Sequence, residues 1–474
     1  MRNSFIAAGF VVLTVAASVS QPTLPHADEH KGLVERLTQV VPQRMERDDV
    51  AGAVMVLIED GNPVWTKAFG MADPTTGRLM SADALFRVES IAKPVTAWGA
   101  MRLAEKGLFD LDAPIDECLK RWRLPAAVEQ ITPRLLLSHS AGVGLGDFTS
   151  RFPPEASRPS LPEHLEQTFA LIAPPGSGFS YSDTGFNLLE LAIEDCTNED
   201  FGALMIREIL KPLEMTAASF DWTGAPMPLG HDLHGRQVIP YVYPGRASGG
   251  LYTTASDIAR FAAASMNGSD QSVLSAESRA ALYRPVVKVK GLFGFAADSY
   301  GLGHFIEALS DGREAVWHGG QGYGWMSHMH LIPETGDGIV ILSNSQRAWP
   351  LFATILRDWS NSLDIAPVGM ARVLWAEIIA RGFIALAVAI AALSVWLAFR
   401  VKTCPAVVKV SAGIIAVPLT IWPIWAFAQD YLFLFSILPG LWPWLGAASI
   451  LAGTGLVSLV LLPRGSKQNL SIKK

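Results

Sequence analysis

Three long stretches without a charged residue lie near the C-terminus, and they restrict the fold of this chain more than any other feature. They cover residues 382–399, about 411–429 and about 441–462. A helix of about 20 apolar residues crosses the hydrocarbon core of a bilayer, so each stretch is long enough for one transmembrane helix. We expect residues 431–439, just before the third stretch, to enter at the membrane interface, where Trp and Tyr are enriched. Residues 382–462 are therefore predicted to form a membrane domain with three transmembrane helices.

The charges beside these stretches predict their orientation. The basic residues are Arg400, Lys402 and Lys409 between the first two stretches and Arg464, Lys467, Lys473 and Lys474 after the third. The link between the second and third stretches carries only Asp430. Loops rich in Lys and Arg stay in the cytoplasm, so we expect a cytoplasmic C-terminus. With three spans, everything before residue 382 then lies on the opposite side of the membrane.

The N-terminus agrees with export. Arg2 precedes an apolar run from Phe5 to about Ala17, and small residues follow. This pattern is typical of a secretory signal peptide, which we place at 1–20. An uncleaved anchor helix is the alternative, and it also exports the body. The predicted location is the bacterial cytoplasmic membrane, with the globular part on the periplasmic or extracellular side.

Composition excludes some classes of partner. The chain has a net charge of −6, and residues 382–474 carry +6, so the first 381 residues carry −12. An acidic body argues against nucleic acid as a partner. Cys118 and Cys196 lie in the exported part, where a disulfide is chemically allowed, but we favour two buried thiols. No Cys/His ligand spacing is present, and we predict neither a metal nor a cofactor.

Residues 31–364 are predicted to form one globular domain. Residues 50–73 favour two strands around a turn at Asp60-Gly61, and residues 336–345 favour a late strand. Helical periodicity covers residues 91–106, and Thr254 with Asp257 is typical of a helix N-terminus. The arrangement indicates an α/β sandwich in which strands from both ends share one sheet and a helical region is inserted between them.

Ser90 and Lys93 stand out within the first predicted helix. Residues three apart share one face of a helix. Pro94 is tolerated only near the start of a helix, which places Ser90 in or near the first turn. A serine hydroxyl is a poor nucleophile until a base removes its proton, and a lysine of lowered pKa is such a base. The spacing is therefore suited to a serine–lysine nucleophile pair, although S-x-x-K alone is a weak signal.

Two downstream motifs strengthen this interpretation. Tyr181-Ser-Asp183 is followed by His318-Gly-Gly320. In this order the three motifs resemble the S-x-x-K, Y-x-N and K-T-G or H-x-G motifs of serine β-lactamase-related hydrolases, in the branch of class C β-lactamases, D-aminopeptidases and esterases. The similarity covers about residues 35–350. It implies a β-lactamase/transpeptidase-like fold, with an antiparallel sheet flanked by helices and a helical subdomain.

The resemblance also implies catalytic roles. Ser90 would be the acylated nucleophile and Lys93 its general base. Tyr181 would carry a proton to the leaving group and help to activate water for deacylation. Without the resemblance, Tyr181 would be interpreted as a core residue.

On the third motif the resemblance implies substrate binding. His318 would face the substrate from a strand, at a place where other branches have lysine. Gly320 would let the substrate approach that strand closely. The backbone N–H groups of Ser90 and Gln321 would form the oxyanion hole.

Two residues depart from the family pattern. Asp183 stands where Asn is usual, and an ionised carboxylate only accepts hydrogen bonds. Asp183 either pairs with Lys93, which would raise the pKa of the lysine and oppose its role as a base, or binds a substrate cation. His318 replaces a fixed positive charge, which weakens the case for a β-lactam that carries a carboxylate.

Other polar and aromatic residues have structural interpretations. We expect His139 to be a structural loop residue, and Asn187 and Asn344 to bond to backbone. Trp317 and Trp325 flank the glycine-rich segment, where they wall a pocket or pack the sheet. The pairs His231/His234 and His328/His330 are expected to be ordinary surface or strand histidines.

Two functions remain open from the sequence. The first is a membrane-anchored, outward-facing serine hydrolase that cleaves an ester or amide, such as a D-amino acid peptide, a short ester or a β-lactam-like compound. The second is a non-enzymatic receptor that is acylated by cell-wall ligands and signals through the spans. The short cytoplasmic segments speak against the receptor. A small molecule or peptide and the lipid bilayer are the expected partners. The sequence gives no information on protein partners.

Overall fold

The computed structural model describes residues 26–125, 128, 131–147, 150–401, 403–429 and 433–461. The predicted signal peptide and the basic C-terminal tail lie outside these residues. The strands are β1 Gly52–Glu59, β2 Asn62–Asp73, β3 Arg78–Leu79, β4 Phe86–Arg87, β5 Gly230–His231, β6 Gln237–Val238, β7 Tyr252–Thr253, β8 Val287–Lys288, β9 Ser299–Tyr300, β10 Phe305–Ala308, β11 Glu314–Gln321, β12 Met326–Ile332 and β13 Asp337–Ser343.

The helices of the globular body are α1 His26–Asp48, α2 Ala92–Glu105, α3 Pro133–Leu137, α4 Leu161–Thr168, α5 Asp183–Thr197, α6 Phe201–Met205, α7 Ala255–Ala264, α8 Ala276–Tyr283 and α9 Trp349–Ser362. The C-terminal helices are α10 Val373–Arg400, α11 Ala406–Phe427, α12 Phe433–Ile437 and α13 Trp442–Leu461. Short turns of tighter or wider helix are η1 Glu89–Ile91, η2 Ile115–Glu117, η3 Ile206–Leu210, η4 Gly291–Phe295 and η5 Gly369–Arg372.

One antiparallel sheet of nine strands organises the body, in the order β3-β2-β1-β13-β12-β11-β10-β9-β8. Strands β1 and β13 pair with each other inside this sheet, with Ala53 opposite Ser343 and Val56 opposite Val340. The hairpin of β1 and β2 turns at Asp60 and Gly61, where positive φ angles of 49° and 74° suit a tight turn. The predicted sheet built from both ends of the domain is therefore confirmed.

Successive side chains of β1 and β13 point to opposite faces of the sheet, so both faces are apolar. Helices cover each face. Met55 and Ile341 pack with α1 and α9 on one face, whereas Val54 and Leu342 pack with α2, α5 and α7 on the other. Thr254 caps α7 by accepting a hydrogen bond from the N–H of Asp257, as the sequence predicts. The sandwich is thus formed by two separate apolar cores with the sheet between them.

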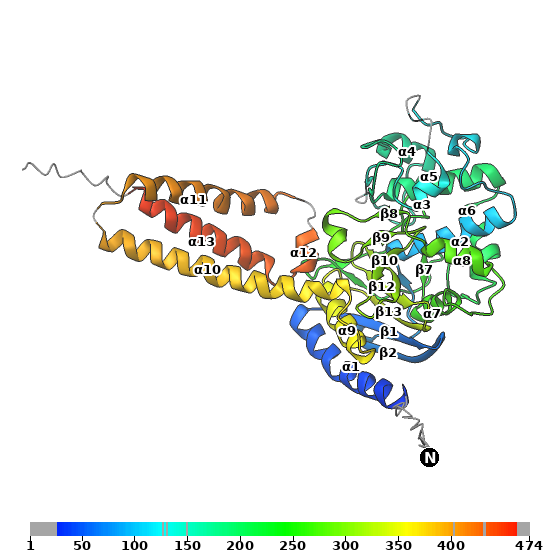
Figure 1. Cartoon of the computed structure of the whole chain (residues 1–474), viewed down its shortest axis with the longest axis horizontal. Helices are drawn as coiled ribbons and strands as arrows, with labels where there is room; N and C mark the ends of the chain where they lie inside the picture. Colours follow the sequence, from blue (N-terminus) through cyan, green and yellow to red (C-terminus); the bar gives the residue numbers. More distant parts are fainter. Residues whose placement is uncertain are drawn as a thin grey trace, which may run out of the picture.

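Three of the C-terminal helices are long and apolar enough to cross a membrane. Figure 1 shows α10, α11 and α13 as a bundle that projects from one end of the body, with α12 beside the junction. The helices α11 and α13 agree with the expected spans, but α10 begins at Val373, well before the expected residue 382. Helix α12 precedes α13 as a separate short element, in agreement with one span after residue 440.

The first C-terminal helix is tied to the body by ion pairs. The carboxylate of Glu377 on α10 lies 2.5 Å from Arg44 and 3.2 Å from Arg47, both on α1. Arg44 also pairs with Asp48, and the side chains of Arg44, Asp48 and Glu377 are all buried. Buried charges are stable only when they are paired, so this cluster fixes α10 against α1.

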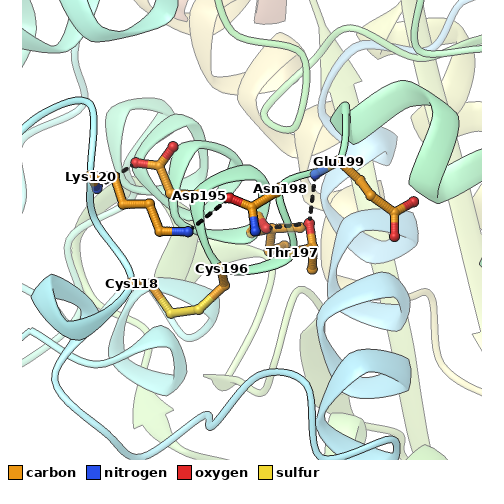
Figure 2. Close-up of a disulfide and its surroundings, with 8 residues drawn as sticks. Cys118, Lys120, Asp195, Cys196, Thr197, Asn198 and Glu199 are labelled. Atoms are coloured by element: carbon orange, nitrogen blue, oxygen red, sulfur yellow. Dashed lines mark hydrogen bonds between the residues drawn. A yellow bond between two sulfur atoms is a disulfide. The ribbon is translucent and has the colours of Figure 1, made fainter.

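The expectation of two free thiols was wrong. Cys118 and Cys196 form a disulfide between the segment after η2 and the end of α5 (Figure 2). The same contact is reinforced by Asp195, whose carboxylate accepts a hydrogen bond of 2.7 Å from the N–H of Lys120. Local sequence gives no measure of the distance between two cysteines 78 residues apart, and only the packing of α5 brings them together.

Candidate active site

Ser90 lies in η1, directly before α2, so that its hydroxyl stands at the start of a buried helix. Glu89, the residue before it, has a φ of 48°, a left-handed conformation that is uncommon for a residue other than glycine. Such a conformation persists where the surroundings hold it in place, and it often accompanies functional residues. The chain therefore enters α2 through a strained turn that carries Ser90.

Lys93 follows one turn later and is fully buried. Its Nζ donates to Ser90 Oγ at 3.0 Å, to Asp183 Oδ1 at 2.6 Å and to the carbonyl of Ser248 at 2.7 Å. Burial alone would lower the pKa of Lys93, but the Asp183 carboxylate and the Tyr181 hydroxyl outweigh it, and the pKa lies above its usual value. The resting lysine is therefore an ammonium ion that donates to the serine oxygen.

Tyr181 and Asp183 come from the loop that leads into α5. Ser182 caps this helix by accepting from the N–H of Gly185 at 2.8 Å, and Asp183 occupies its first position, where a negative charge suits the helix dipole. Burial raises the pKa of Tyr181, although the ammonium of Lys93 opposes this effect. Tyr181 is therefore a neutral phenol in the resting site.

His139 packs against this loop and bonds to its backbone. Its Nδ1 accepts a hydrogen bond of 3.1 Å from the N–H of Ser182, and its carbonyl accepts from the N–H of Ser180 at 2.7 Å. Its ring lies 4.3 Å from that of Tyr181, between ring centroids. Burial, with a smaller effect of Lys93, holds the pKa of His139 well below its usual value. The expected structural role of His139 agrees with these contacts.

His318 lies on β11 and is also neutral. Its Nδ1 is 2.8 Å from the carbonyl of Gly319, which can only accept, so we assign the proton to Nδ1. Nε2 then accepts from the hydroxyl of Tyr300 at 3.1 Å. Burial, followed by the charge of Lys93, lowers the pKa of His318 well below its usual value. This residue supplies polarity and shape to the site but no positive charge.

The end of β11 runs beside the Ser90 turn. A side chain at Gly320 would meet the carbonyl of Val88 at 2.2 Å and the hydroxyl of Ser327 at 2.3 Å. The glycine therefore allows β11 to approach the serine segment. The expected approach of substrate at Gly320 stays a prediction. Gln321 accepts a hydrogen bond of 2.6 Å from Trp349 Nε1, which fixes its side chain at the end of the strand.

A buried polar cluster holds the serine turn, and the sequence analysis missed it. Arg87 donates to Glu89 Oε1 at 2.9 Å, and the hydroxyls of Tyr241 and Tyr243 donate to the Glu89 carboxylate at 3.0 and 3.1 Å. The guanidinium of Arg87 also lies over the rings of Tyr241, Tyr243 and Tyr252. These contacts stabilise the left-handed conformation of Glu89. No local pattern could have revealed them, since the tyrosines lie more than 150 residues away.

The site opens into one cavity of about 1000 Å³, here called the Ser90 cavity. Ser90, Tyr181, Asp183, His318 and Gln321 line it. Lys93 and Gly320 are not among its lining residues and lie behind the surface. The structure thus brings all seven predicted site residues together, with five at the cavity and two beneath it.

The remaining sequence expectations divide between the cavity and the core. Trp317 and Asn187 line the cavity, whereas Trp325 is buried and donates to the carbonyl of Pro228. Asn344 bonds to backbone, with Nδ2 2.9 Å from the carbonyl of Leu229, as expected. Among the described residues, no group of three His, Cys, Asp or Glu side chains could hold a metal ion.

The geometry permits acyl transfer. When Lys93 gives up one proton, its lone pair lies 3.0 Å from Ser90 Oγ and can accept the hydroxyl proton. The Tyr181 hydroxyl contacts both Ser90 and Lys93, so it can pass a proton between them and a leaving group. A serine, a lysine and a tyrosine so arranged against an antiparallel sheet define the class, a serine hydrolase of the β-lactamase/transpeptidase-like fold.

Comparison with known families agrees with this class. The family model described as Beta-lactamase matches residues 37–356, and the chain belongs to that family. Esterase EstB of Burkholderia gladioli is 26% identical over 271 residues, which are 48% of this chain and 69% of that protein. Penicillin-binding protein 4 of Amycolatopsis lactamdurans is 25% identical over 339 residues, 66% of this chain and 86% of that protein.

Solved structures show the same fold. The octameric penicillin-binding protein homologue from Pyrococcus abyssi has a TM-score of 0.62 at 25% identity and covers 70% of this chain and 78% of its own. The D-amino acid amidase from Ochrobactrum anthropi SV3 has a TM-score of 0.56 at 24% identity and covers 66% of this chain and 91% of its own. The protein is accordingly an enzyme of the serine hydrolase class.

Proposed function

We propose that this protein is an outward-facing serine hydrolase, anchored in the bacterial cytoplasmic membrane, that cleaves an ester or amide through an acyl-enzyme on Ser90. The observation that carries the proposal is the contact of 3.0 Å between Lys93 Nζ and Ser90 Oγ at the wall of a cavity of about 1000 Å³. A cavity of this size is typical of sites for small-molecule ligands.

The reaction has two halves. Ser90 Oγ attacks the carbonyl carbon while neutral Lys93 takes the hydroxyl proton, and the N–H groups of Ser90 and Gln321 stabilise the oxyanion. Collapse breaks the bond to the leaving group, which receives a proton through Tyr181. Water then attacks the acyl ester, returning the proton to Ser90 and releasing the acid.

The raised pKa of Lys93 requires a route for its extra proton. Asp183 Oδ1, at 2.6 Å from Nζ, is the nearest acceptor for that proton. The ion pair with this carboxylate opposes loss of the proton, so neutral Lys93 forms only as the pH rises toward the raised pKa of the lysine. Asp183 therefore sets the pH at which Lys93 becomes a base, in addition to any contact with substrate.

The class of substrate follows from charge. His318 is neutral, so the site lacks the fixed cation that a carboxylate-bearing β-lactam would use. An uncharged ester or a D-aminoacyl amide fits better. One relative is named an esterase, and one similar structure is that of a D-amino acid amidase. Asp183 is one-quarter exposed and can still accept a hydrogen bond from a substrate amine.

Anchoring and orientation rest on three further observations. The helices α10, α11 and α13 have the length and hydropathy of membrane spans. The basic residues near the ends of α10 and α11 favour the cytoplasm for that side. The Cys118–Cys196 disulfide suits an oxidising compartment for the body. Residues 31–364 would then be the catalytic domain and residues 382–462 the anchor.

The test uses the full chain in lipid nanodiscs with a panel of chromogenic esters and D-aminoacyl amides. We expect turnover that falls by about 10⁴-fold or more in Ser90→Ala, because the nucleophile is lost. Intact-mass spectrometry in parallel should detect an acyl adduct of the wild type that Ser90→Ala lacks. Undiminished turnover in Ser90→Ala would contradict the proposal.

The same experiment separates the hydrolase from the acylated receptor. A stable adduct on Ser90 without turnover would favour the receptor. Repeated turnover would exclude it, since a receptor that holds its acyl group cannot complete a second cycle.

A further inference from the structure

The Ser90 cavity extends beyond the catalytic residues to the C-terminal helices. Its wall contains Ser90 and His318 of the catalytic site. The same wall contains Trp375 and Ile379 of α10 and Ile437 of α12. The reacting serine and the first C-terminal helix therefore share one continuous space, although they lie far apart in the sequence.

Much of the cavity wall is apolar, although Arg372 and Gln346 also line it. The apolar part includes Leu292, Phe293 and Phe295 of η4, together with Phe305 and Trp317 from the sheet. Phe293 stacks on Tyr181 with ring centroids 5.1 Å apart, so the apolar wall begins directly beside the proton-transfer residues. A hydrocarbon chain attached to a group at Ser90 would meet this wall first.

Several apolar side chains of this wall are exposed. The exposed fractions are 66% for Phe295, 67% for Trp375 and 70% for Ile379. Single exposed apolar residues are ordinary, but several around one opening mark a contact with lipid, ligand or protein. These three residues all line the same cavity, which connects their exposure to the site.

The opening also lies next to the expected membrane. The apolar span of α10 begins at about residue 382, so Ile379 precedes it by about 5 Å and Trp375 by about 10 Å at 1.5 Å per residue. Tryptophan favours this interfacial depth. If α10 spans the bilayer, the cavity opens at its outer surface.

The start of α10 cannot move freely away from this wall. The N–H of Gly369 in η5 donates to Glu307 at 3.0 Å, and Arg372 donates to the carbonyl of Phe295. The ion pairs of Glu377 with Arg44 and Arg47 lie on the same helix. The cavity wall formed by α10 is therefore part of the folded body.

We infer that the substrate is a membrane amphiphile whose ester or amide lies at Ser90 and whose acyl chain reaches the bilayer along Phe293, Phe295, Trp375 and Ile379. This inference rests on the proposed hydrolase function and adds the substrate class. The chain enters sideways from the outer leaflet of the bilayer in which the enzyme is embedded. The carbonyl end is then the only polar part of the acyl group that enters the site.

The first experiment compares chain lengths in the full chain in nanodiscs. Nitrophenyl acetate and nitrophenyl octanoate are hydrolysed by the wild type, by Ile379→Ser and by Ile378→Ser. Ile378 is 60% exposed on the same helix but is not a lining residue, so it is a matched control. We expect Ile379→Ser to lower kcat/KM for the octanoate by about fivefold or more, the size of effect that lost apolar contacts give in enzyme specificity. The kcat/KM of Ile379→Ser for the acetate should stay within about twofold of wild type, as should the kcat/KM of Ile378→Ser for both esters.

The second experiment tests the route of entry. A palmitoyl ester is placed either in the same nanodiscs as the enzyme or in separate vesicles of the same lipids. We expect hydrolysis at least about tenfold faster in the shared bilayer, because transfer of a long chain through water is slow. Equal rates would overturn entry from the enzyme's own bilayer.

The outcomes separate this inference from the proposed function. If the acetate is cleaved but Ile379→Ser and Ile378→Ser behave alike with both esters, the substrate class is overturned and the hydrolase stands. If no ester is cleaved and Ser90 is not acylated, the proposed function fails. Binding of the acyl chain is then measured without turnover, by crosslinking a photoreactive diazirine palmitate to Ser90→Ala in nanodiscs. Crosslinks at residues 291–295 and 375–379 would support the acyl site. Crosslinks spread along α10 and α11 would overturn it.

Discussion

At the scale of single residues, the contact between Lys93 and Asp183 decides how the site works. A lysine that is to act as a base should have a lowered pKa, yet the Asp183 carboxylate at 2.6 Å raises it. The family pattern has asparagine at this place, which lacks the charge. The proposed base is therefore held in its protonated form, and the activity should depend on pH through the pKa of Lys93.

Replacing Asp183 with Asn should move the activity to lower pH. The basic form of Lys93 is required, so kcat/KM rises with pH through the pKa of Lys93. Asp183 raises that pKa, and its removal should shift the rising limb down by about one pH unit or more. A pH profile of ester hydrolysis measures the shift.

The control is Asp147→Asn, which removes a carboxylate from the same cavity away from the three partners of Lys93. This substitution should leave the rising limb of the pH profile nearly in place. If the rising limb of Asp183→Asn is unchanged, or moves to higher pH, Asp183 does not raise the pKa of Lys93.

The sequence indicated candidate site residues, but it did not indicate the contacts that position them. Ser90, Lys93, Tyr181 and Asp183 could be identified because each belongs to a short motif. The Arg87–Glu89–Tyr241 cluster was not, since hydrogen bonds of a buried carboxylate leave no spacing in the sequence. Gly320 was expected to allow substrate to approach closely, and the structure adds that the carbonyl of Val88 also needs the space beside this glycine.

At the scale of elements, β10 and η5 meet at a buried carboxylate. Glu307 on β10 accepts from the N–H of Gly369 in η5 at 3.0 Å. Burial raises the pKa of Glu307 to about 7, although the hydrogen bond from Gly369 opposes the rise. The junction between the sheet and the first C-terminal helix therefore contains a group that titrates near neutral pH.

Replacing Glu307 with Gln should stabilise the protein above pH 7. The folded state binds the proton of Glu307 more tightly than the unfolded state, so the wild type loses stability as pH rises from about 4.5 to about 7. Glutamine keeps the acceptor for Gly369 without the buried charge. We expect a gain in the free energy of unfolding on the order of 2–3 kcal/mol at pH 8, most of which disappears by pH 5.

Thermal unfolding of the full chain at pH 5 and pH 8 measures this gain. Glu314→Gln, an exposed position on β11, serves as the control and should change neither value. A gain for Glu307→Gln that is equal at both pH values would contradict the titration of a buried carboxylate.

The boundary of α10 shows why element ends are difficult to predict. Glu377 and Arg381 interrupt the apolar pattern before residue 382. The predicted span therefore began at residue 382, several residues after the helix itself begins. In the structure the charge of Glu377 is paired with Arg44 and Arg47, and the helix continues through it. A charge that is neutralised by a distant partner looks like a helix boundary in the sequence.

At the scale of the whole molecule, the orientation of the bundle can be tested directly. Thr403 lies between α10 and α11, and Gly440 lies between α12 and α13, and both are exposed. In a Cys404→Ser background, Gly440→Cys should react with a membrane-impermeant maleimide in intact spheroplasts, because this loop is predicted to lie outside. Thr403→Cys should react only after lysis.

Cys118 and Cys196 do not interfere with this labelling, because they are joined in a disulfide. Labelling of Thr403→Cys in intact spheroplasts with protection of Gly440→Cys would reverse the proposed topology. The shared sheet of β1 and β13 and the three apolar spans could be predicted from hydrophobic patterns. The position of the bundle against the body could not, because it depends on contacts between segments that are distant in the sequence.

The direct continuation of η5 into α10 has a consequence for how the enzyme meets its substrates. No linker separates Arg372 from Val373, and the ion pairs of Glu377 hold the helix to the body. In a bilayer, such a protein would search for substrate by lateral diffusion in two dimensions. Its rate would then follow the number of substrate molecules per unit area of membrane, and compounds dispersed in the surrounding volume would escape it.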